Sequence, residues 1–265
     1  FKMSQASANL NIMIKAARRA SRGLLRDFGE VENLQVSSKA AGDFVSKADI
    51  KAEEIIHDEL NDARPNYGWV GEESEEKKGQ DTTRRWIVDP LDGTSNFLHG
   101  IPHWAISIAL EYKKEIIAGV IYDPIKDEMF TAEKGQGAWL NDRRLRVSDR
   151  AKMIEMLFAT GLPFGEKEGL SETLEQLERL MPKCAGVRRQ GAAALDLAYV
   201  AAGRLDGYWE KGLKAWDIAA GLIIAKEAGA LIEGFASPLE SPLLSGSLIC
   251  ANNLIFKNFA QLLRE

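Results

Sequence analysis

The 265-residue sequence lacks the features that mark membrane, secreted and nucleic-acid-binding proteins. No apolar run approaches the ~18–20 residues that a helix needs to span a bilayer, so no membrane partner is expected. There are only two cysteines, Cys184 and Cys250, without metal-ligand spacing, which indicates reduced core thiols and a cytoplasmic location. The net charge of −5 gives no support for general nucleic-acid binding. The arginines between residues 143 and 150 are more typical of a solvated surface.

The first half of the chain predicts long helices followed by an antiparallel sheet. Apolar residues recur at helical spacing over residues 8–28 and again over 49–60. The apolar run 86–88 predicts a buried strand, and the polar residues 77–85 before it are predicted to form a loop. From residue 104 to residue 140, short apolar runs alternate with turn residues, as in consecutive antiparallel strands. This order is typical of an α+β fold.

The second half predicts a different arrangement. Composition shifts near residues 147–152, so we expect an N-terminal domain (1–147) and a C-terminal domain (148–265). Beyond this boundary, predicted strands alternate with helices, among them an Ala- and Leu-rich helix at 191–202. Such alternation indicates an α/β unit with a partly parallel sheet.

The stretch from Trp86 to Phe97 contains the residues most suited to chemistry. Asp89 and Asp92 follow the predicted strand, and carboxylates at a strand end suit hard cations such as Mg²⁺. Gly93 and Thr94 come next and can offer backbone N–H and hydroxyl donors to an anion. Cation and anion sites side by side favour metal-assisted phosphate chemistry. The alternative is a strand that ends in an ordinary capped turn.

Three more acidic residues could extend this site. Glu72 directly follows an apolar strand, Glu210 ends another, and Asp217 lies beside Trp216 in the first turn of a predicted helix. Each has a simpler interpretation, because acidic side chains are common on solvated faces and at helix N-termini. Asp49 opens the second predicted helix, where an Asp is usually an N-cap.

Three segments that carry these acids resemble the signatures of the inositol monophosphatase family. They are Gly71-Glu72-Glu73-Ser74, Asp89-Pro90-Leu91-Asp92-Gly93-Thr94-Ser95-Asn96-Phe97 and Trp216-Asp217-Ile218-Ala219-Ala220-Gly221, and they occur in the family's order. Residues 191–207 resemble the bacterial SuhB branch of that family. The resemblance implies a layered αβαβα sandwich of the sugar phosphatase type, built from both halves of the chain.

The resemblance also implies roles for individual residues. The implied metal ligands are Glu72, Asp89, the Leu91 carbonyl, Asp92 and Asp217, binding two or three Mg²⁺ ions. The implied catalytic residues are Glu72, Thr94 and Asp49. The implied substrate contacts are Leu91, Asp92, Gly93, Thr94, Arg188, Gly191, Ala192, Ala193, Glu210 and Asp217. Most ligands would therefore come from the N-terminal domain, and the C-terminal domain would add Asp217 and substrate contacts.

The implied function is Mg²⁺-dependent hydrolysis of a phosphate monoester by an activated water. Myo-inositol 1-phosphate, a small phosphorylated polyol, is the expected substrate, and fructose 1,6-bisphosphate or a nucleotide 3′-phosphate is the alternative within the superfamily. A third possibility is a SuhB-like role in transcription and ribosomal RNA processing, in which the protein acts by binding a transcription complex. Relatives of this kind are usually homodimeric, and some are inhibited by lithium.

Overall fold

The structure is a computed structural model that describes residues 6–30, 36–40, 43–163 and 168–265. Its larger sheet has seven strands, and only the pair β3–β4 is parallel. In spatial order these strands are β3 (Tyr67–Gly71), β4 (Asp81–Asp92), β5 (Ala105–Tyr112), β6 (Glu115–Asp123), β7 (Glu128–Glu133), β8 (Gly137–Leu140) and β9 (Arg143–Arg144). The antiparallel sheet predicted for the first half is therefore confirmed, with one parallel strand at its edge.

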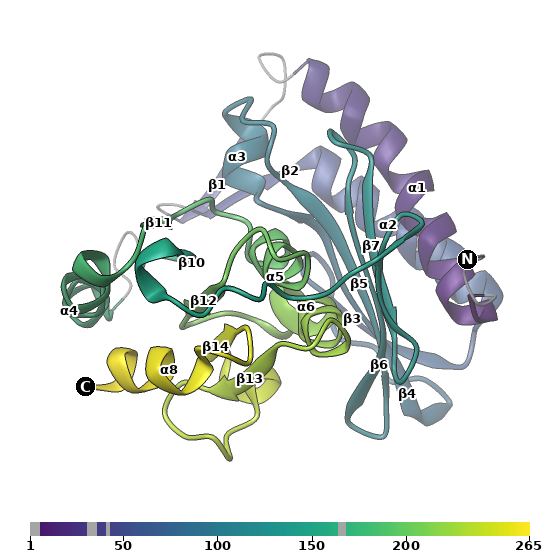
Figure 1. Cartoon of the computed structure of the whole chain (residues 1–265). Coiled ribbons are helices and arrows are strands. Elements are labelled where there is room, and N and C mark those ends of the chain that lie inside the picture. The colour runs from purple at the N-terminus through teal and green to yellow at the C-terminus, as the bar shows by residue number, and fades with distance from the viewer. Residues whose placement is uncertain (1–5, 31–35, 41–42, 164–167) are drawn as a thin grey trace.

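Two long helices cover one face of this sheet, α1 (Ala8–Gly29) and α2 (Lys47–Ala63) (Figure 1). Helix α1 begins where the Ser7 hydroxyl accepts a hydrogen bond from the Leu10 N–H at 3.1 Å, an N-cap that satisfies a free backbone donor. Its buried stripe includes Met13 and Leu24, which pack with the strand residues Trp86 and Val88. The helical spacing in the sequence reflects this apolar stripe.

The second sheet has five strands in the spatial order β11-β10-β12-β14-β13. Their bounds are β10 (Leu157–Thr160), β11 (Gly186–Arg188), β12 (Gly207–Glu210), β13 (Leu231–Gly234) and β14 (Leu248–Ala251). Strand β10 runs parallel to both β11 and β12, whereas β14 is antiparallel to β12 and β13. The partly parallel sheet predicted for the second half is thus confirmed.

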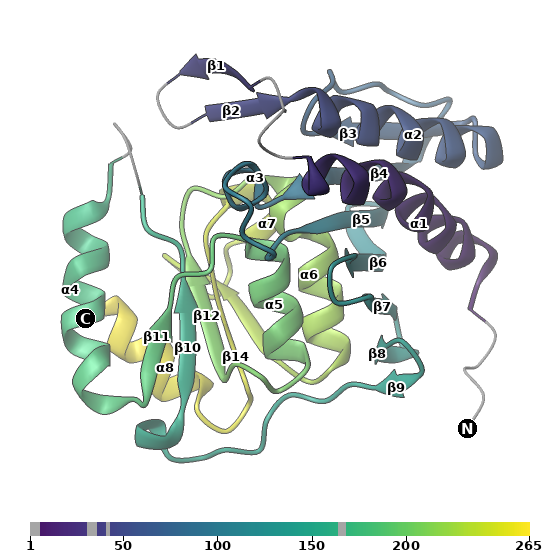
Figure 2. The same ribbon diagram turned by 90° about the horizontal axis from the view of Figure 1, so that it is seen from above.

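Helices α5 (Ala193–Ala201) and α6 (Ala215–Glu227) lie between the two sheets, and α4 (Leu170–Leu180) and α8 (Phe256–Arg264) cover the outer face of the smaller sheet (Figure 2). Because α5 and α6 meet protein on both sides, they are apolar around most of their circumference. The layers therefore follow the expected αβαβα order. The short helix α7 (Pro242–Ser245) precedes β14.

Close packing at α6 matters for the site, because this helix carries Asp217. A Cβ added at Gly119 of β6 would lie 2.7 Å from Ile223 Cγ2 and 2.8 Å from the Ala220 carbonyl oxygen. The helix therefore lies directly on the larger sheet, at a glycine that permits the contact.

Two details differ from the sequence prediction. The predicted loop at residues 77–85 is wrong in its second part, because β4 already begins at Asp81. Its outer residues are polar and solvent-facing, and Arg85 pairs with Glu111 on β5 at 2.9 Å, so the segment carries no apolar signal. In addition, α2 begins at Lys47, which places Asp49 inside the first turn instead of at the N-cap.

Strands β1 (Val36–Ala40) and β2 (Asp43–Ser46) form a small antiparallel pair. Among the described residues, no helix is long and apolar enough to cross a membrane. Both cysteines are buried free thiols, as the sequence indicated.

Candidate active site

The site begins where the parallel strands β3 and β4 end at the same edge of the larger sheet. Gly71 pairs with Val88 in the strand register, and the next residue, Glu72, donates its backbone N–H to the Val88 carbonyl oxygen at 3.2 Å. Asp89 follows Val88 and is 2% exposed. Burial, followed by the charge of Glu72, raises the pKa of Asp89 well above its usual value. Two carboxylates that repel each other in this way are stabilised by a shared proton or by a cation between them.

The register of β4 against β5 shifts between Asp89 and Asp92, and the next groups of the site lie at and just after this irregularity. The Leu91 N–H donates to Asp89 Oδ1 at 2.9 Å, and the Leu91 carbonyl oxygen accepts from the Thr94 hydroxyl at 3.0 Å. Gly93 adopts a left-handed backbone with φ of +96°, and a Cβ there would lie 3.1 Å from the His103 carbonyl oxygen. Glycine is therefore required at the turn into α3 (Thr94–Leu98).

Helix α2 brings a third carboxylate to this turn. Asp49 is 1% exposed, and its Oδ2 lies 3.3 Å from the Thr94 hydroxyl oxygen. Burial, followed by the charge of Glu72, raises the pKa of Asp49 well above its usual value. Ligand oxygens of Asp49, Glu72 and Glu73 all lie within 4.8 Å of one another.

The second half of the chain completes the site. Asp92 Oδ2 accepts the Ala194 backbone N–H of α5 at 2.7 Å, across 102 residues of sequence. Gly191, Ala192 and Ala193 immediately precede this amide, so the predicted substrate-contact segment lies beside Asp92. Asn96 supports the same junction, because its side-chain amide donates to the Gln190 carbonyl oxygen at 2.8 Å.

Asp217 reaches the site from the first turn of α6. Its Oδ2 accepts the Lys214 backbone N–H at 2.7 Å, which orients the carboxylate at the helix N-terminus. Its negative charge raises the pKa values of Glu72, Asp89 and Asp92, after burial as the largest cause for each. The structure therefore brings together the four carboxylates predicted from separate segments.

This donor set fits a hard divalent cation. The Glu72 side chain is exposed at the surface, yet the protein atoms around its carboxyl displace water from it and, followed by the charge of Asp217, raise its pKa to about 7. Carboxylate and carbonyl oxygens are the ligands that Mg²⁺ prefers, and a bound cation removes the repulsion among them. Glu72, Asp89, Asp92, Asp217 and the Leu91 carbonyl are the groups that would hold it.

Glu53 is a supporting residue that sequence reasoning missed. It is 4% exposed on α2, and its Oε2 accepts the Glu73 backbone N–H at 2.8 Å. A Cβ added at Gly71 would lie 2.6 Å from Glu53 Oε1, so the glycine before Glu72 makes room for this carboxyl. Glu53 lies four residues after Asp49, on the same helix face, and this spacing is the only signal that could have identified it.

The predicted substrate contacts Glu210 and Arg188 differ in their surroundings. Glu210 ends β12 and is half-buried, with its carboxylate against Tyr208. Arg188 is the last residue of the edge strand β11, and its side chain is exposed. Its Nη1 donates to the carbonyl oxygen of the preceding residue, Val187, at 3.4 Å. Arg189, the next residue, approaches Gly191 and acts electrostatically on Asp196. The assignment of Arg188 to substrate stays a prediction.

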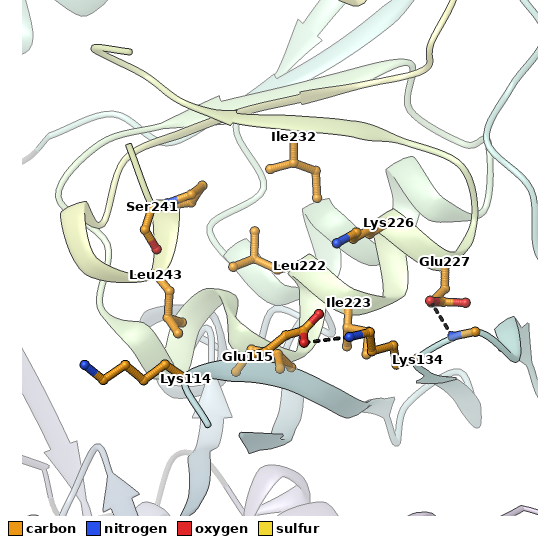
Figure 3. Close-up of a pocket in the computed structure, with 13 residues that line it drawn as sticks. Lys114, Glu115, Lys134, Leu222, Ile223, Lys226, Glu227, Ile232, Ser241 and Leu243 are labelled. Carbon is orange, nitrogen blue, oxygen red and sulfur yellow. Dashed lines mark hydrogen bonds and ion pairs between the residues drawn. The ribbon is translucent and has the colours of Figure 1, made fainter. Parts of the chain in front are cut away.

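A cavity of about 520 Å³ lies elsewhere, against the C-terminal half of α6 (Figure 3). Its floor is apolar, with Leu222 and Ile223, and its rim includes an ion pair between Lys134 and Glu115 at 2.6 Å. It contains none of the carboxylates described above, and Asp217 lies at the other end of the helix. The chemistry therefore belongs to the carboxylate site and not to this cavity.

Comparison with known proteins gives one consistent result. The sequence model described as "Inositol monophosphatase family" matches residues 6–265. An inositol-1-monophosphatase of Rhizobium meliloti (strain 1021) is 53% identical over 98% of this chain and 97% of its own length. The Nus factor SuhB of Pasteurella multocida (strain Pm70) is 43% identical over 94% and 92%. The crystal structure of extragenic suppressor protein suhB from Bartonella henselae superposes with a TM-score of 0.94 at 50% identity, over 98% of this chain and 99% of that one.

Proposed function

Because the chain belongs to the inositol monophosphatase family and is therefore a phosphatase of a metal-dependent family, we propose that it hydrolyses myo-inositol 1-phosphate with Mg²⁺. The observation that carries this proposal is the meeting of Glu72, Asp89, Asp92 and Asp217, from three separate elements, around one edge of the larger sheet. The proposed products are myo-inositol and phosphate.

The proposed reaction uses the carboxylates in two groups. When bound, two or three Mg²⁺ ions neutralise the phosphate dianion and lower the pKa of water. Glu72 and the Thr94–Asp49 pair position the attacking water, since the Thr94 hydroxyl lies between Asp49 and the Leu91 carbonyl. Asp92 and Asp217 would hold a metal ion near the leaving alkoxide. No covalent intermediate is required.

The substrate is proposed to lie between the two halves of the chain. Gly93 and Thr94 bind the phosphate through backbone N–H groups and the Thr hydroxyl. Glu210, Arg188 and the backbone of residues 191–193 face the inositol ring. The hydrogen bond between Asp92 and the Ala194 amide supports this arrangement, because it joins the segment proposed to bind phosphate to the segment proposed to contact the ring.

Phosphate release from a panel of monoesters tests the proposal. We expect fastest turnover of myo-inositol 1-phosphate, dependence on Mg²⁺ and inhibition by added Li⁺. Faster turnover of fructose 1,6-bisphosphate or of a nucleotide 3′-phosphate would assign the chain to one of the alternative activities. Absence of turnover on all three in saturating Mg²⁺ would exclude the enzymatic proposal.

Relatives named Nus factor SuhB support a second proposal, that the chain also binds a transcription complex. Pull-down of transcription elongation factors by wild-type protein and by a metal-site variant tests it, because equal binding by both would separate this role from catalysis. Binding by neither would contradict it.

We also propose a homodimer and a cytoplasmic location. The buried free thiols Cys184 and Cys250 are compatible with a reducing compartment. Light scattering coupled to gel filtration measures the oligomeric state. Fractionation of the source cells measures the location.

A further inference from the structure

Glu210 is confined by a tyrosine on its own strand. Tyr208 lies two residues earlier on β12 and therefore points to the same face of the sheet. Its hydroxyl donates to Glu210 Oε2 at 2.6 Å. This distance is that of a strong hydrogen bond to a charged acceptor. One oxygen of the Glu210 carboxylate thus has a fixed donor.

A glycine on the neighbouring strand confines Glu210 from the other side. Strand β10 runs parallel to β12 with Thr160 beside Trp209, so Gly161 follows directly beside Glu210. A Cβ added at Gly161 would overlap with the Glu210 carboxyl group. Gly161 has no positive φ, so the space it leaves, and not its backbone conformation, explains the glycine.

Tyr208 is itself held rigidly. It is 0% exposed and packs in the core between the smaller sheet and helices α5 and α6. Burial, followed by the charges of Glu210 and Asp196, raises the pKa of Tyr208 well above its usual value, so the hydroxyl keeps its proton and remains a donor. The charge of Asp92 also acts on it. Tyr208 is therefore close enough to sense the charge of a carboxylate at the metal end of the site as well as that of Glu210.

We propose that Gly161 and Tyr208 are positioning residues that hold the Glu210 carboxylate in one orientation and so set the preference for polyol phosphates. This inference rests on the proposed function, in which Glu210 accepts hydrogen bonds from ring hydroxyls. A carboxylate fixed in advance loses no side-chain freedom when the polyol binds. A phosphate ester without hydroxyl groups cannot donate to Glu210, so the orientation of this carboxylate does not change the affinity for such an ester.

Two substitutions test the inference, each with a matched control. Tyr208→Phe removes only the buried hydroxyl, and Gly161→Ala adds only the Cβ that displaces the carboxylate. The controls are Tyr112→Phe, on the far part of the larger sheet, and Gly23→Ala on α1, where an added Cβ meets nothing within 4 Å. We expect both test variants to raise KM for myo-inositol 1-phosphate on the order of tenfold. kcat, and KM for p-nitrophenyl phosphate, should stay near the wild-type values.

The inference is overturned if KM for myo-inositol 1-phosphate does not change, or if KM rises equally for both substrates. Crystal structures of the two variants give a readout independent of turnover. They should show the Glu210 carboxylate displaced, and an unmoved carboxylate would contradict the inference. Wild-type protein that hydrolyses p-nitrophenyl phosphate but not myo-inositol 1-phosphate would instead refute the proposed function.

Discussion

The Thr94 hydroxyl connects three segments of the chain through a single atom. It lies 3.0 Å from the Leu91 carbonyl oxygen and 3.3 Å from Asp49 Oδ2, so it joins the start of α3 to the end of β4 and to α2. A hydroxyl has one hydrogen to donate, and its oxygen can also accept one from a water. Its contact with Asp49, which has a carboxyl oxygen within 4.8 Å of a Glu72 oxygen, suits it to orient the attacking water.

Thr94→Val should therefore lower kcat on the order of a hundredfold, because the side-chain shape is kept and the hydroxyl is lost. The unfolding temperature should change by only a few degrees. Steady-state kinetics with myo-inositol 1-phosphate and a thermal melt check both statements, with the exposed Thr82→Val as a matched control. A variant that retains full kcat would remove Thr94 from the catalytic residues.

The motifs made the carboxylate residues predictable, but not the residues that support them. Asp89, Asp92 and Thr94 lie in one short stretch with a recognisable order. Glu53 and Gly161 act on residues 20 and 49 positions away, and Tyr208 acts on a residue two positions along its own strand. A buried glutamate on an amphipathic helix, or a glycine after a strand, has no distinctive sequence pattern, so only the fold identifies them.

At the scale of secondary structure, the end of β3 shows how a strand positions a metal ligand. The parallel pairing of β3 with β4 places Glu72 beside Asp89. The Glu53 carboxylate of α2 accepts the backbone N–H of the next residue, Glu73. Gly71 permits this contact because a side chain there would collide with the Glu53 carboxyl. Three elements therefore fix the direction in which Glu72 leaves the strand.

Gly71→Ala should disturb this junction. We expect the free energy of unfolding to fall by about 1–3 kcal/mol, the usual cost of overpacking a buried site. The Mg²⁺ concentration needed for half-maximal activity should rise as Glu72 moves. Urea unfolding and Mg²⁺ titration of turnover measure the two effects, with Gly29→Ala as the control, since nothing lies within 4 Å of a Cβ there. An unchanged Mg²⁺ requirement would show that Glu72 is not positioned in this way.

Hydrophobic periodicity predicted the elements that bury an apolar face and failed where none is buried. Helix α1 lies close to its predicted range of residues 8–28, and α2 extends a few residues beyond the predicted range of 49–60 at each end. The start of β4 was missed because Asp81 to Arg85 are polar and exposed or half-buried. Arg84 and Arg85 are held by backbone pairing with β5 and by the ion pair between Arg85 and Glu111. Pairing of this kind leaves no trace in the order of apolar residues.

For the whole molecule, the site is a concentration of negative charge that folding brings together from both halves of the chain. Asp89 and Asp92 are buried on one sheet, and Asp217 approaches from the helix layer between the sheets. Burial, followed by their mutual repulsion, raises the pKa values of Asp89 and Asp92. The unliganded fold therefore carries an electrostatic cost that a bound cation offsets.

The electrostatic cost of the carboxylate cluster predicts how the stability of the protein depends on pH when a chelator removes divalent cations. The pKa of Glu72 is raised from 4.5 to about 7, so the stabilisation from its protonated form is complete below pH 4.5 and is lost as the pH rises through 7. The melting temperature in EDTA should thus fall between pH 6 and pH 8, and Mg²⁺ should restore more of it at pH 8.

Differential scanning fluorimetry at each pH, with EDTA or with Mg²⁺, measures this dependence. Glu72→Gln should flatten the fall in EDTA, whereas Glu75→Gln, an exposed acid three residues on, should not. A melting temperature in EDTA that does not fall, or Mg²⁺ that has equal effects at both pH values, would contradict the electrostatic explanation.

Turnover of myo-inositol 1-phosphate by Asp92→Asn tests the central claim most directly. Asp92 connects the carboxylates of the larger sheet to the Ala194 amide of the other half, and the substitution keeps its shape while removing its charge. Compared with the wild type and the exposed control Asp62→Asn, we expect Mg²⁺-dependent phosphate release to fall on the order of a hundredfold or more. Full Mg²⁺-dependent turnover by Asp92→Asn would contradict the account.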